Sequence, residues 1–388
     1  MLYYSLQQKA KVLAGAGTVN KIGEVIQEAG YKKPLLVYDE GIAQCGIADK
    51  VIGSIREAQI EYAIFDRVVP NPPDDVINEG GRLCKEWGCD CVIAVGGGSS
   101  IDTAKGIAVL QFNPGHDILD FADMSVTMNT CSGIISIPTT SGTGSELSNG
   151  IIVSNHLTDE KVPIVAYNAM SDVVILDAEL TIGMPKGLTA ITGLDVFSHA
   201  WEAYTTVLCS PVVEPVLEKV MQEVVTYLPR AIADGTDLEA RERMLIAASL
   251  GGWGLFNCCA NVGHSLGHVL GGVFHLPHGA ACAYGAPAAL KHVALGASKK
   301  IQRVGEILGA TFDGSETPEQ IGTKTAAAYI TFRDEVVGLK PLSTYHLNPE
   351  DVIAVAPKVA VECFAQFTPV PVTVEAATIM LKEIVQSL

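Results

Sequence analysis

The first half of the chain alternates short apolar runs with amphipathic segments. The apolar runs have the length of strands and lie at 34–38, 61–65, 91–95, 133–137 and 173–176. Between them, residues 19–29 and 74–87 place apolar side chains at helical spacing, and two acidic residues after Pro72-Pro73 suit the first turn of a helix. This alternation predicts a mostly parallel sheet with helices on both faces.

The strand pattern stops near residue 180. From residue 185 onward the chain is rich in Ala, Leu, Glu and Met, and apolar residues recur at helical spacing over 216–227, 239–250 and 374–385. The segment TIGMPKG, residues 181–187, separates the two patterns. We therefore predict an α/β domain over residues 1–183 and an all-helical domain over residues 184–388.

The balance of charges argues against nucleic acid as a partner. Acidic side chains outnumber basic ones by 43 to 26, whereas a nucleic-acid-binding surface needs basic side chains to neutralise phosphates.

The N-terminus and the cysteines indicate a compartment. The N-terminus does not show the basic segment followed by an apolar segment that is typical of a signal peptide. The ten cysteines show no CxxC spacing, so we interpret most of them as buried apolar residues in a reducing compartment. We expect a cytoplasmic protein that does not bind nucleic acid.

One long stretch of the chain carries no formal charge. Residues 244–290 contain no Asp, Glu, Lys or Arg, yet they hold four of the nine histidines. Polar residues interrupt the stretch often enough that no run of about 20 apolar residues occurs, which argues against a membrane span. A buried helical region rich in histidine is the better prediction.

A glycine-rich turn follows the third apolar run. Residues 91–105 read CVIAVGGGSSIDTAK, a strand, three glycines, two serines and the start of a helix. Glycines let the backbone approach a phosphate closely, and the amides at a helix N-terminus point at the anion. Glycines after a buried strand also make ordinary turns, so this segment alone leaves both interpretations open.

The best candidate for an acidic ribose contact precedes these glycines. In the usual Rossmann fingerprint that acid follows the glycines by roughly 20 residues. Here Asp39 ends the first strand, which indicates a rearranged, Rossmann-like fold. A carboxylate at this place can accept hydrogen bonds from an adenosine ribose and would repel a 2′-phosphate, which favours NAD over NADP. A solvated turn residue is the alternative interpretation of Asp39.

A second loop of small residues follows the fourth apolar run. Residues 137–149 read IPTTSGTGSELSN, with six hydroxyl side chains, two glycines and no charge before Glu146. Hydroxyls and backbone amides in such a loop can contact phosphate or the nicotinamide amide. An ordinary loop rich in Ser and Thr would usually carry more charge, so we favour a binding role.

An aspartate and several histidines have the spacing of metal ligands. Asp195 and His199 are four residues apart and would share one face of a helix. His264 and His268 have the same spacing in the uncharged stretch, where His278 stands at a Pro-His-Gly break. Burying such groups without a charge partner is costly, and one carboxylate with several imidazoles suits Fe²⁺ or Zn²⁺. The pattern predicts a metal site, with a hydrogen-bonded core histidine as the alternative for any one of them.

Four segments together resemble the signature sequences of the iron-containing (group III) alcohol dehydrogenases. In the order in which that family has them, they are GGGSSIDTAK (96–105), PTTSGTGSE (138–146), GLDVFSHAWEAY (193–204) and HSLGHVLGGVFHLPHG (264–279). The resemblance implies a dinucleotide-binding α/β domain and a helical metal-binding domain, an architecture like that of dehydroquinate synthase. It also implies NAD(P)-dependent interconversion of alcohols and carbonyl compounds.

The resemblance assigns roles to individual residues. It places the metal ligands on Asp195, His199, His264 and His278. It places the catalytic histidine on His268. The implied cofactor contacts are Asp39, Asn71, Gly97, Gly98, Ser99, Asp102, Thr139, Thr140, Thr143, Ser148 and Lys161. His275 has no counterpart as a ligand, and we interpret it as a pocket-lining or hydrogen-bonded core histidine.

The combined prediction is a metal-dependent alcohol dehydrogenase. It would transfer hydride between NAD(H) and a small alcohol, aldehyde or ketone, with NADP less favoured, Fe²⁺ as the metal and Zn²⁺ as an alternative. The low charge around the histidines favours a neutral substrate over a phosphorylated one, and the family leads us to expect a homodimer or higher oligomer without a membrane partner. The alternatives are a zinc-dependent, glycerol-type polyol dehydrogenase on the same scaffold, or a metal- or nucleotide-binding protein without turnover.

Overall fold

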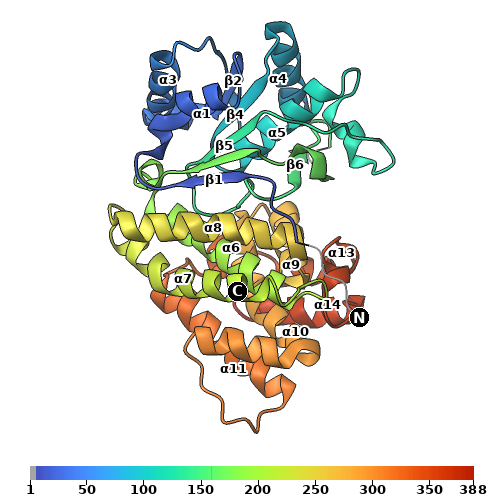
Figure 1. Cartoon of the computed structure of the whole chain (residues 1–388). Coiled ribbons are helices and arrows are strands. Elements are labelled where there is room, and N and C mark those ends of the chain that lie inside the picture. Colours follow the sequence, from blue (N-terminus) through green and yellow to red (C-terminus); the bar gives the residue numbers. More distant parts are fainter. Residues whose placement is uncertain (1–5, 159) are drawn as a thin grey trace. The chain divides into compact units, whose positions relative to one another are not determined.

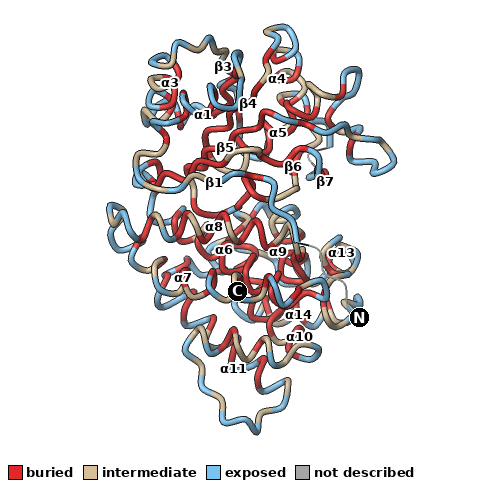
Figure 2. The backbone as a smooth tube through the Cα atoms, in the orientation of Figure 1, coloured by how far each residue is buried: buried red, intermediate tan, exposed pale blue. Residues whose placement is uncertain are grey.

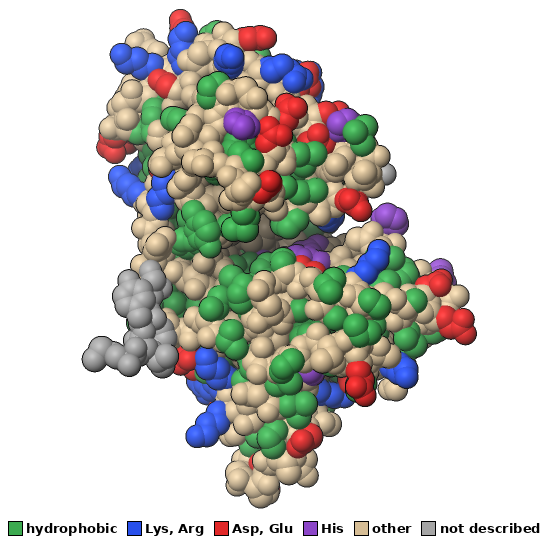
Figure 3. Space-filling view, turned by 90° about the vertical axis from the view of Figure 1, so that its right-hand side faces the viewer, with side chains coloured by type: hydrophobic (Ala, Val, Ile, Leu, Met, Phe, Trp, Pro, Cys, Tyr) green, Lys and Arg blue, Asp and Glu red, His purple; other side chains and the backbone are tan. Residues whose placement is uncertain are grey.

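The chain forms two compact units, each with its own core. The computed structural model describes residues 6–158 and 160–388. One unit comprises residues 8–183, and the other comprises residues 184–388 together with residues 6 and 7 (Figure 1). Charged side chains of both signs are interspersed with apolar ones on the face shown in Figure 3. The excess of acid therefore does not gather into one patch on that face.

The first unit is built on a six-stranded parallel sheet with the strand order β1-β8-β5-β4-β2-β3. The strands are β1 (Lys11–Ala14), β2 (Pro34–Asp39), β3 (Ala63–Val68), β4 (Cys91–Gly96), β5 (Ile134–Pro138) and β8 (Val173–Leu176). All five predicted apolar runs lie in this sheet, which confirms the predicted fold class. The sequence pattern did not reveal β1, because three of its four residues are exposed and it shows no apolar alternation.

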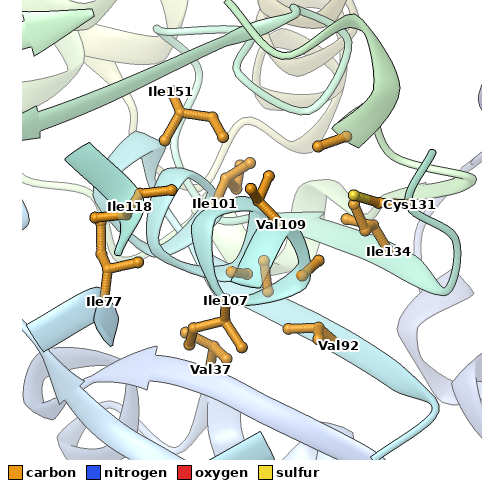
Figure 4. Packing of buried hydrophobic residues seen from close by; sticks show 14 of the residues in the cluster. Val37, Ile77, Val92, Ile101, Ile107, Val109, Ile118, Cys131, Ile134 and Ile151 are labelled. Atoms are coloured by element: carbon orange, nitrogen blue, oxygen red, sulfur yellow. The ribbon is translucent and has the colours of Figure 1, made fainter. Parts of the chain in front are cut away.

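Helices cover both faces of this sheet (Figure 1). They are α1 (Ile22–Glu28), α2 (Glu40–Gln44), α3 (Ile47–Glu57), α4 (Asp74–Trp87) and α5 (Gly98–Phe112). Successive strand residues alternate between the faces: Leu36 of β2 packs in a cluster with α1 and α3, whereas Val37 packs in a cluster with α4 and α5. Figure 4 shows Val37 beside Ile107 of α5 in the second cluster.

Two features of the first unit were not predicted. A separate antiparallel hairpin pairs β6 (Gly150–Ser154) with β7 (Lys161–Val165). Cys84 at the end of α4 forms a disulfide with Cys89, a pairing that the interpretation of most cysteines as buried apolar residues did not include. Pro163 within β7 weakened the strand signal there, because proline cannot donate a backbone hydrogen bond.

The second unit is built from helices and connecting loops, with no strand among its described residues. Its helices are α6 (Lys186–Thr205), α7 (Glu214–Ala233), α8 (Leu238–Cys258), α9 (Val262–Phe274), α10 (His278–Ile307), α11 (Pro318–Thr331), α12 (Pro349–Ala354), α13 (Ala356–Val361) and α14 (Val374–Val385). The three predicted helical periods fall within α7, α8 and α14. Short 3₁₀ helices also occur in the two units: η1 (Thr18–Lys21), η2 (Ile118–Ala122), η3 (Tyr167–Ala169), η4 (Ala178–Thr181), η6 (Leu342–Tyr345) and η7 (Ala365–Phe367). A short π-helix, η5 (Phe332–Val336), follows α11.

The uncharged stretch 244–290 lies inside this helical unit. It covers most of α8, all of α9 and the start of α10, and most of its residues are buried (Figure 2). Among the described residues, no single helix is long and apolar enough to cross a membrane. Only α8 and α9 taken together pass that test, and they are bent by 109°.

Candidate metal centre and cofactor loops

Helix α6 carries the aspartate and the first histidine of the predicted metal site. Both Asp195 and His199 are buried, and Nε2 of His199 lies 3.7 Å from Oδ1 of Asp195. They share a face of the helix because they are four residues apart. A third polar residue on this helix, Glu202, is also buried and lies seven residues after Asp195. Helix α6 therefore presents three chemically active side chains to the interior of the unit.

The start of α9 fixes His264 against Glu202. Asn261 caps this helix by accepting the N–H of Gly263 at 3.1 Å. The carboxylate of Glu202 accepts the backbone N–H groups of Asn261 at 3.2 Å and His264 at 2.8 Å, and it lies 2.8 Å from Nδ1 of the His264 ring. Burial raises the pKa of Glu202, and the two N–H donors oppose that rise. Since Nδ1 is engaged with Glu202, Nε2 of His264 is the ring atom left for another partner.

Helix α10 brings a third imidazole and a thiol to the same place. It begins at His278, whose Nε2 lies 3.5 Å from Oδ1 of Asp195. Cys282 follows one helical turn later, with Sγ 3.8 Å from Nε2 of His278. One ligand atom each of Asp195, His264, His278 and Cys282 lies within 4.8 Å of all the others. Three helices thus converge on one cluster of metal-binding groups.

These residues fit a divalent cation. Oδ1 of Asp195, Nδ1 of His199 and Nε2 of His264 are buried without a hydrogen-bond partner among the described residues. Leaving one such atom unsatisfied costs about 1–3 kcal/mol, so the neighbouring Asp195 and His264 require a partner. His199 faces Asp195 with its other ring nitrogen, Nε2, and is not in the set of ligand atoms within 4.8 Å of one another. Burial lowers the pKa of His264 to about 4, which keeps its imidazole neutral and able to bind metal at pH 7. A carboxylate with several imidazoles suits iron or zinc.

His268 occupies a different position from the other histidines of the cluster. Its side chain is about one-third exposed, and its ring centroid lies 5.3 Å from that of His278. Nδ1 of His268 lies 2.8 Å from Oε1 of Glu362, and Oε2 of the same carboxylate accepts the hydroxyl of Ser265 at 2.7 Å and the N–H of Phe364 at 2.8 Å. The carboxylate can only accept, so Nδ1 of His268 carries the proton and Nε2 stays free to accept one.

Two of these functional residues escaped the sequence analysis, and one prediction is corrected. Glu202 could have been found from its place seven residues after Asp195 in a buried helix, whereas Glu362 lies 94 residues from its partner His268 and leaves no local signal. His275 is exposed at the C-terminal end of α9, with φ of 57°. The core alternative for His275 is therefore wrong, because its side chain is exposed where the helix ends, and the pocket-lining alternative stays a prediction.

In the first unit, the two predicted cofactor loops lie against each other. Strand β4 ends at Gly96, where φ is 147°, and α5 begins two residues later at Gly98. A Cβ atom at Gly98 would lie 2.8 Å from the Thr143 side chain, and one at Gly97 would lie 3.2 Å from that of Thr140. Only glycine allows so close an approach, so the glycine turn and the hydroxyl-rich loop form one surface at the N-terminus of α5.

Most of the proposed cofactor residues follow neighbouring strands at one edge of the sheet. Asp39 ends β2, Asn71 follows β3, the glycine turn follows β4, and residues 139–148 follow β5. Ligands of open parallel sheets bind outside the carboxyl ends of the strands, which is where these loops lie. Oδ1 of Asp39 caps α2 by accepting the N–H of Ile42 at 3.0 Å. Lys161 lies on β7 of the hairpin, paired with Ser154, whose N–H is donated to the carbonyl of Pro72 at 2.9 Å in the segment after β3.

Asp102 also has a structural role in this unit. Its carboxylate accepts the hydroxyl of Ser145 and, at 3.0 Å, the N–H of Ile152, so both oxygens hold the hydroxyl-rich loop and the hairpin to α5. Lys105, one turn on, donates to the carbonyls of Ser148 at 2.9 Å and Gly150 at 3.1 Å. This buried pair shapes the loop against which we expect the cofactor to lie.

Comparison with known proteins identifies the family. Residues 9–178 match the family model described as iron-containing alcohol dehydrogenase, and residues 189–385 match the C-terminal model of the same family. The NAD-dependent methanol dehydrogenase of Bacillus methanolicus is 34% identical over 303 residues, which are 78% of this chain and 79% of that protein. The 1,3-propanediol dehydrogenase of Klebsiella pneumoniae is 34% identical over 327 residues, 84% of each. A crystal structure of a 1,3-propanediol oxidoreductase superposes with a TM-score of 0.92 at 30% identity, covering 99% of this chain and 100% of the other.

Fold and sequence together define a dinucleotide-dependent dehydrogenase with an α/β and a helical domain. The chain belongs to the iron-containing alcohol dehydrogenase family. It is therefore an oxidoreductase that interconverts alcohols and carbonyl compounds with NAD. The predicted family, fold class and enzyme class are confirmed.

Proposed function

We propose that Asp195, His199, His264 and His278 hold the Fe²⁺ ion of this enzyme, with Zn²⁺ as the alternative metal. The observation that carries the proposal is the convergence of two buried residues with unpartnered ligand atoms, Asp195 and His264, with Nε2 of His278 3.5 Å and Nε2 of His199 3.7 Å from Oδ1 of Asp195. Asp195 supplies the only formal negative charge among the four ligands. The bound cation would then be the positive charge beside the stretch 244–290, which has no formal charge of its own.

The bound ion would act as a Lewis acid towards the substrate oxygen while hydride passes between the substrate carbon and C4 of nicotinamide. The protein's own groups prepare this site. Glu202 holds Nδ1 of His264 and so aims Nε2 at the cluster. Burial of Asp195 and His199 excludes water from the inner side of the site and strengthens the electrostatic interactions there.

We propose that His268 carries the proton of the alcohol. Nε2 of its ring is free to accept that proton, because the bond to Glu362 fixes the proton already present on Nδ1. The partial exposure of His268 gives the accepted proton a route to solvent, in contrast to the buried His199 and His264. Proton transfer by a positioned side chain of this kind contributes about 10²- to 10⁴-fold in rate.

We infer that NAD binds at the carboxyl edge of the sheet in the first unit. The residues proposed to contact it are Asp39, Asn71, Gly97, Gly98, Ser99, Asp102, Thr139, Thr140, Thr143, Ser148 and Lys161. The α5 N-terminus behind the glycine turn suits the pyrophosphate. Asp39 is half-buried and has one oxygen engaged in the helix cap, which leaves the other for the ribose. Its charge disfavours the 2′-phosphate of NADP.

We further propose a small neutral alcohol, aldehyde or ketone as substrate, and a homodimer or larger oligomer in the cytoplasm. The absence of Lys and Arg from 244–290 supports a substrate without phosphate groups. Relatives named as methanol and 1,3-propanediol dehydrogenases agree with a small alcohol. The oligomeric state rests on the family resemblance alone.

The metal content of single variants tests the ligand assignment. Asp195→Ala and His264→Ala should each lose bound metal, measured by elemental analysis of protein purified without oxygen. His268→Ala removes a histidine four residues from His264 and should keep the metal while losing turnover in an NADH absorbance assay. Full metal content in both ligand variants, or metal loss in His268→Ala, would contradict the assignment.

A further inference from the structure

Cys282 lies among the candidate metal ligands, although the sequence analysis assigned it no role. Its Sγ lies 3.8 Å from Nε2 of His278, and it belongs with Asp195 and His264 to the group whose ligand atoms all lie within 4.8 Å of one another. Neighbouring donor atoms around one ion with ordinary metal–nitrogen and metal–sulfur bonds are roughly 3.1–3.6 Å apart. The separation of sulfur and nitrogen here is close to that range.

The position of the thiol is fixed by the packing of two helices. Cys282 and His278 are four residues apart on α10, so their side chains share one face. On α9, the residue opposite Cys282 is Gly267, between His264 and His268, and a Cβ atom there would clash with Sγ. Helix α9 can approach the thiol only because this residue is glycine. The thiol is thereby held beside the helix that carries His264.

The surroundings of Cys282 differ from those of an ordinary core cysteine. Cys91 and Cys131 are equally buried but pack within the apolar clusters of the first unit. Cys282 instead has a carboxylate and two imidazoles as neighbours. Two of these neighbours, Asp195 and His264, are at most 3% exposed and carry unpartnered ligand atoms. The polar environment of the thiol is that of a ligand.

We propose that the thiolate of Cys282 is a fifth protein ligand of the metal, beside Asp195, His199, His264 and His278. This inference rests on the metal site of the proposed function. On coordination the S–H bond breaks, a sulfur–metal bond forms, and the proton is released to solvent. A thiolate is a soft donor, so it favours Zn²⁺, Fe²⁺ and Co²⁺ over Mg²⁺ and Mn²⁺.

Cobalt substitution of the full chain tests the proposal. Co²⁺ is added to metal-free protein without oxygen, and the near-ultraviolet absorption of a thiolate-to-cobalt charge transfer is recorded together with the visible bands of the ion. The wild-type protein should show the charge-transfer band. Cys282→Ser should lose it while still binding one cobalt per chain with visible bands. Cys131→Ser, which alters a buried thiol in the first unit, should keep it.

The possible outcomes separate this inference from the proposed function. Visible cobalt bands without a charge-transfer band in the wild type would overturn the role of Cys282 and leave the metal site intact. Failure of the wild type to bind cobalt would overturn both. A band that persists in Cys282→Ser would place the sulfur ligand elsewhere and overturn the proposal. Should the variant not fold, X-ray absorption of the cobalt-loaded wild type gives the answer, since a sulfur neighbour at the cobalt supports Cys282 and its absence overturns the proposal.

Discussion

Oε1 of Glu202 lies 2.8 Å from Nδ1 of His264, while Oε2 of the same carboxylate accepts the backbone N–H of that histidine at 2.8 Å. Glu202 therefore holds both the ring and the main chain of His264. Because Nδ1 is occupied, the unpartnered Nε2 is the atom directed to the metal cluster. A carboxylate behind a ligating histidine also increases its basicity. In the proposed metal site Glu202 would therefore support a ligand without itself being one.

Replacing Glu202 by glutamine should weaken metal binding about 10- to 100-fold, the range typical for partners of ligating histidines. The amide keeps the size of the side chain but lacks the charge that orients the ring. Competition with a chelator of known affinity measures the change. Glu223→Gln alters another buried glutamate, on α7, and should leave the metal affinity as it is. Equal affinities in the wild type and Glu202→Gln would show that the contact does not support the site.

Replacing His268 by alanine should lower kcat by about 10²- to 10⁴-fold. The expected loss reflects proton transfer, so the variant should keep its metal and bind NADH as before. Steady-state rates with a short alcohol across a range of pH provide the measurement. An unchanged pH–rate profile would exclude His268 as the proton carrier.

Glu362 should act through His268. Glu362→Ala removes the acceptor for the Nδ1 proton and frees the ring to turn, so we expect kcat to fall by about tenfold or more with little change in metal content. Glu362→Gln retains an oxygen that can accept this proton and should recover part of the rate. A fall in kcat of the same size in both variants would argue against a positioning role.

The same residue predicts a pH dependence of stability. Burial alone would raise the pKa of Glu362, but hydrogen bonds from His268 and Ser265 hold that pKa at about 2, below its ordinary value of 4.5. His268 on α9 and the neighbouring Cys363 are the titratable groups in contact with it. The charged form is favoured in the folded state, so this stabilisation is complete above pH 4.5 and is lost as the pH falls from 4.5 to 2.

Unfolding by urea at several pH values measures this effect. The difference in the free energy of unfolding between the wild type and Glu362→Gln should shrink as the pH is lowered through that window. Glu306→Gln, which alters an exposed carboxylate on α10, serves as the control. A difference that stays constant from pH 5 to the lowest pH at which the protein folds would contradict the assignment.

Asp39→Ser tests the choice of cofactor. Serine is as good a helix cap as aspartate, so α2 should remain intact and the free energy of unfolding should change by less than about 1 kcal/mol. Loss of the negative charge should raise the ratio of kcat/KM for NADP to that for NAD by about tenfold or more, because repulsion of the 2′-phosphate is removed. An unaltered ratio would mean that Asp39 does not contact the adenosine ribose.

Local patterns in the sequence predicted most of the fold. Apolar runs identified five strands of the sheet, and four of them, β2, β4, β5 and β8, are buried along most of their length, as strands of parallel sheets usually are. The sixth strand, β1, lies at the edge and is mostly exposed, so its sequence carries no such signal. Helix α10 spans 30 residues and continues past Pro287, which a pattern search takes as a stop. Tertiary packing overrides local preference in that helix.

The site was predictable as far as its contacts are local. Asp195 and His199 could be proposed from the sequence because four residues along a helix bring two side chains to one face. The same spacing joins His278 to Cys282, but ten cysteines without a motif gave no reason to single one out. Glu362 comes to His268 from 94 residues away, after α13, and only the packing of α13 with α9 brings them together.

The measurement closest to the central claim is the turnover of metal-free enzyme. The protein is stripped with a chelator without oxygen, and reduction of NAD by a short primary alcohol is followed by NADH absorbance before and after Fe²⁺ is returned. We predict that the stripped enzyme is inactive although folded by circular dichroism, and that one equivalent of Fe²⁺ per chain restores the rate. Undiminished turnover in the stripped enzyme would contradict the assignment of a catalytic metal to Asp195, His199, His264 and His278.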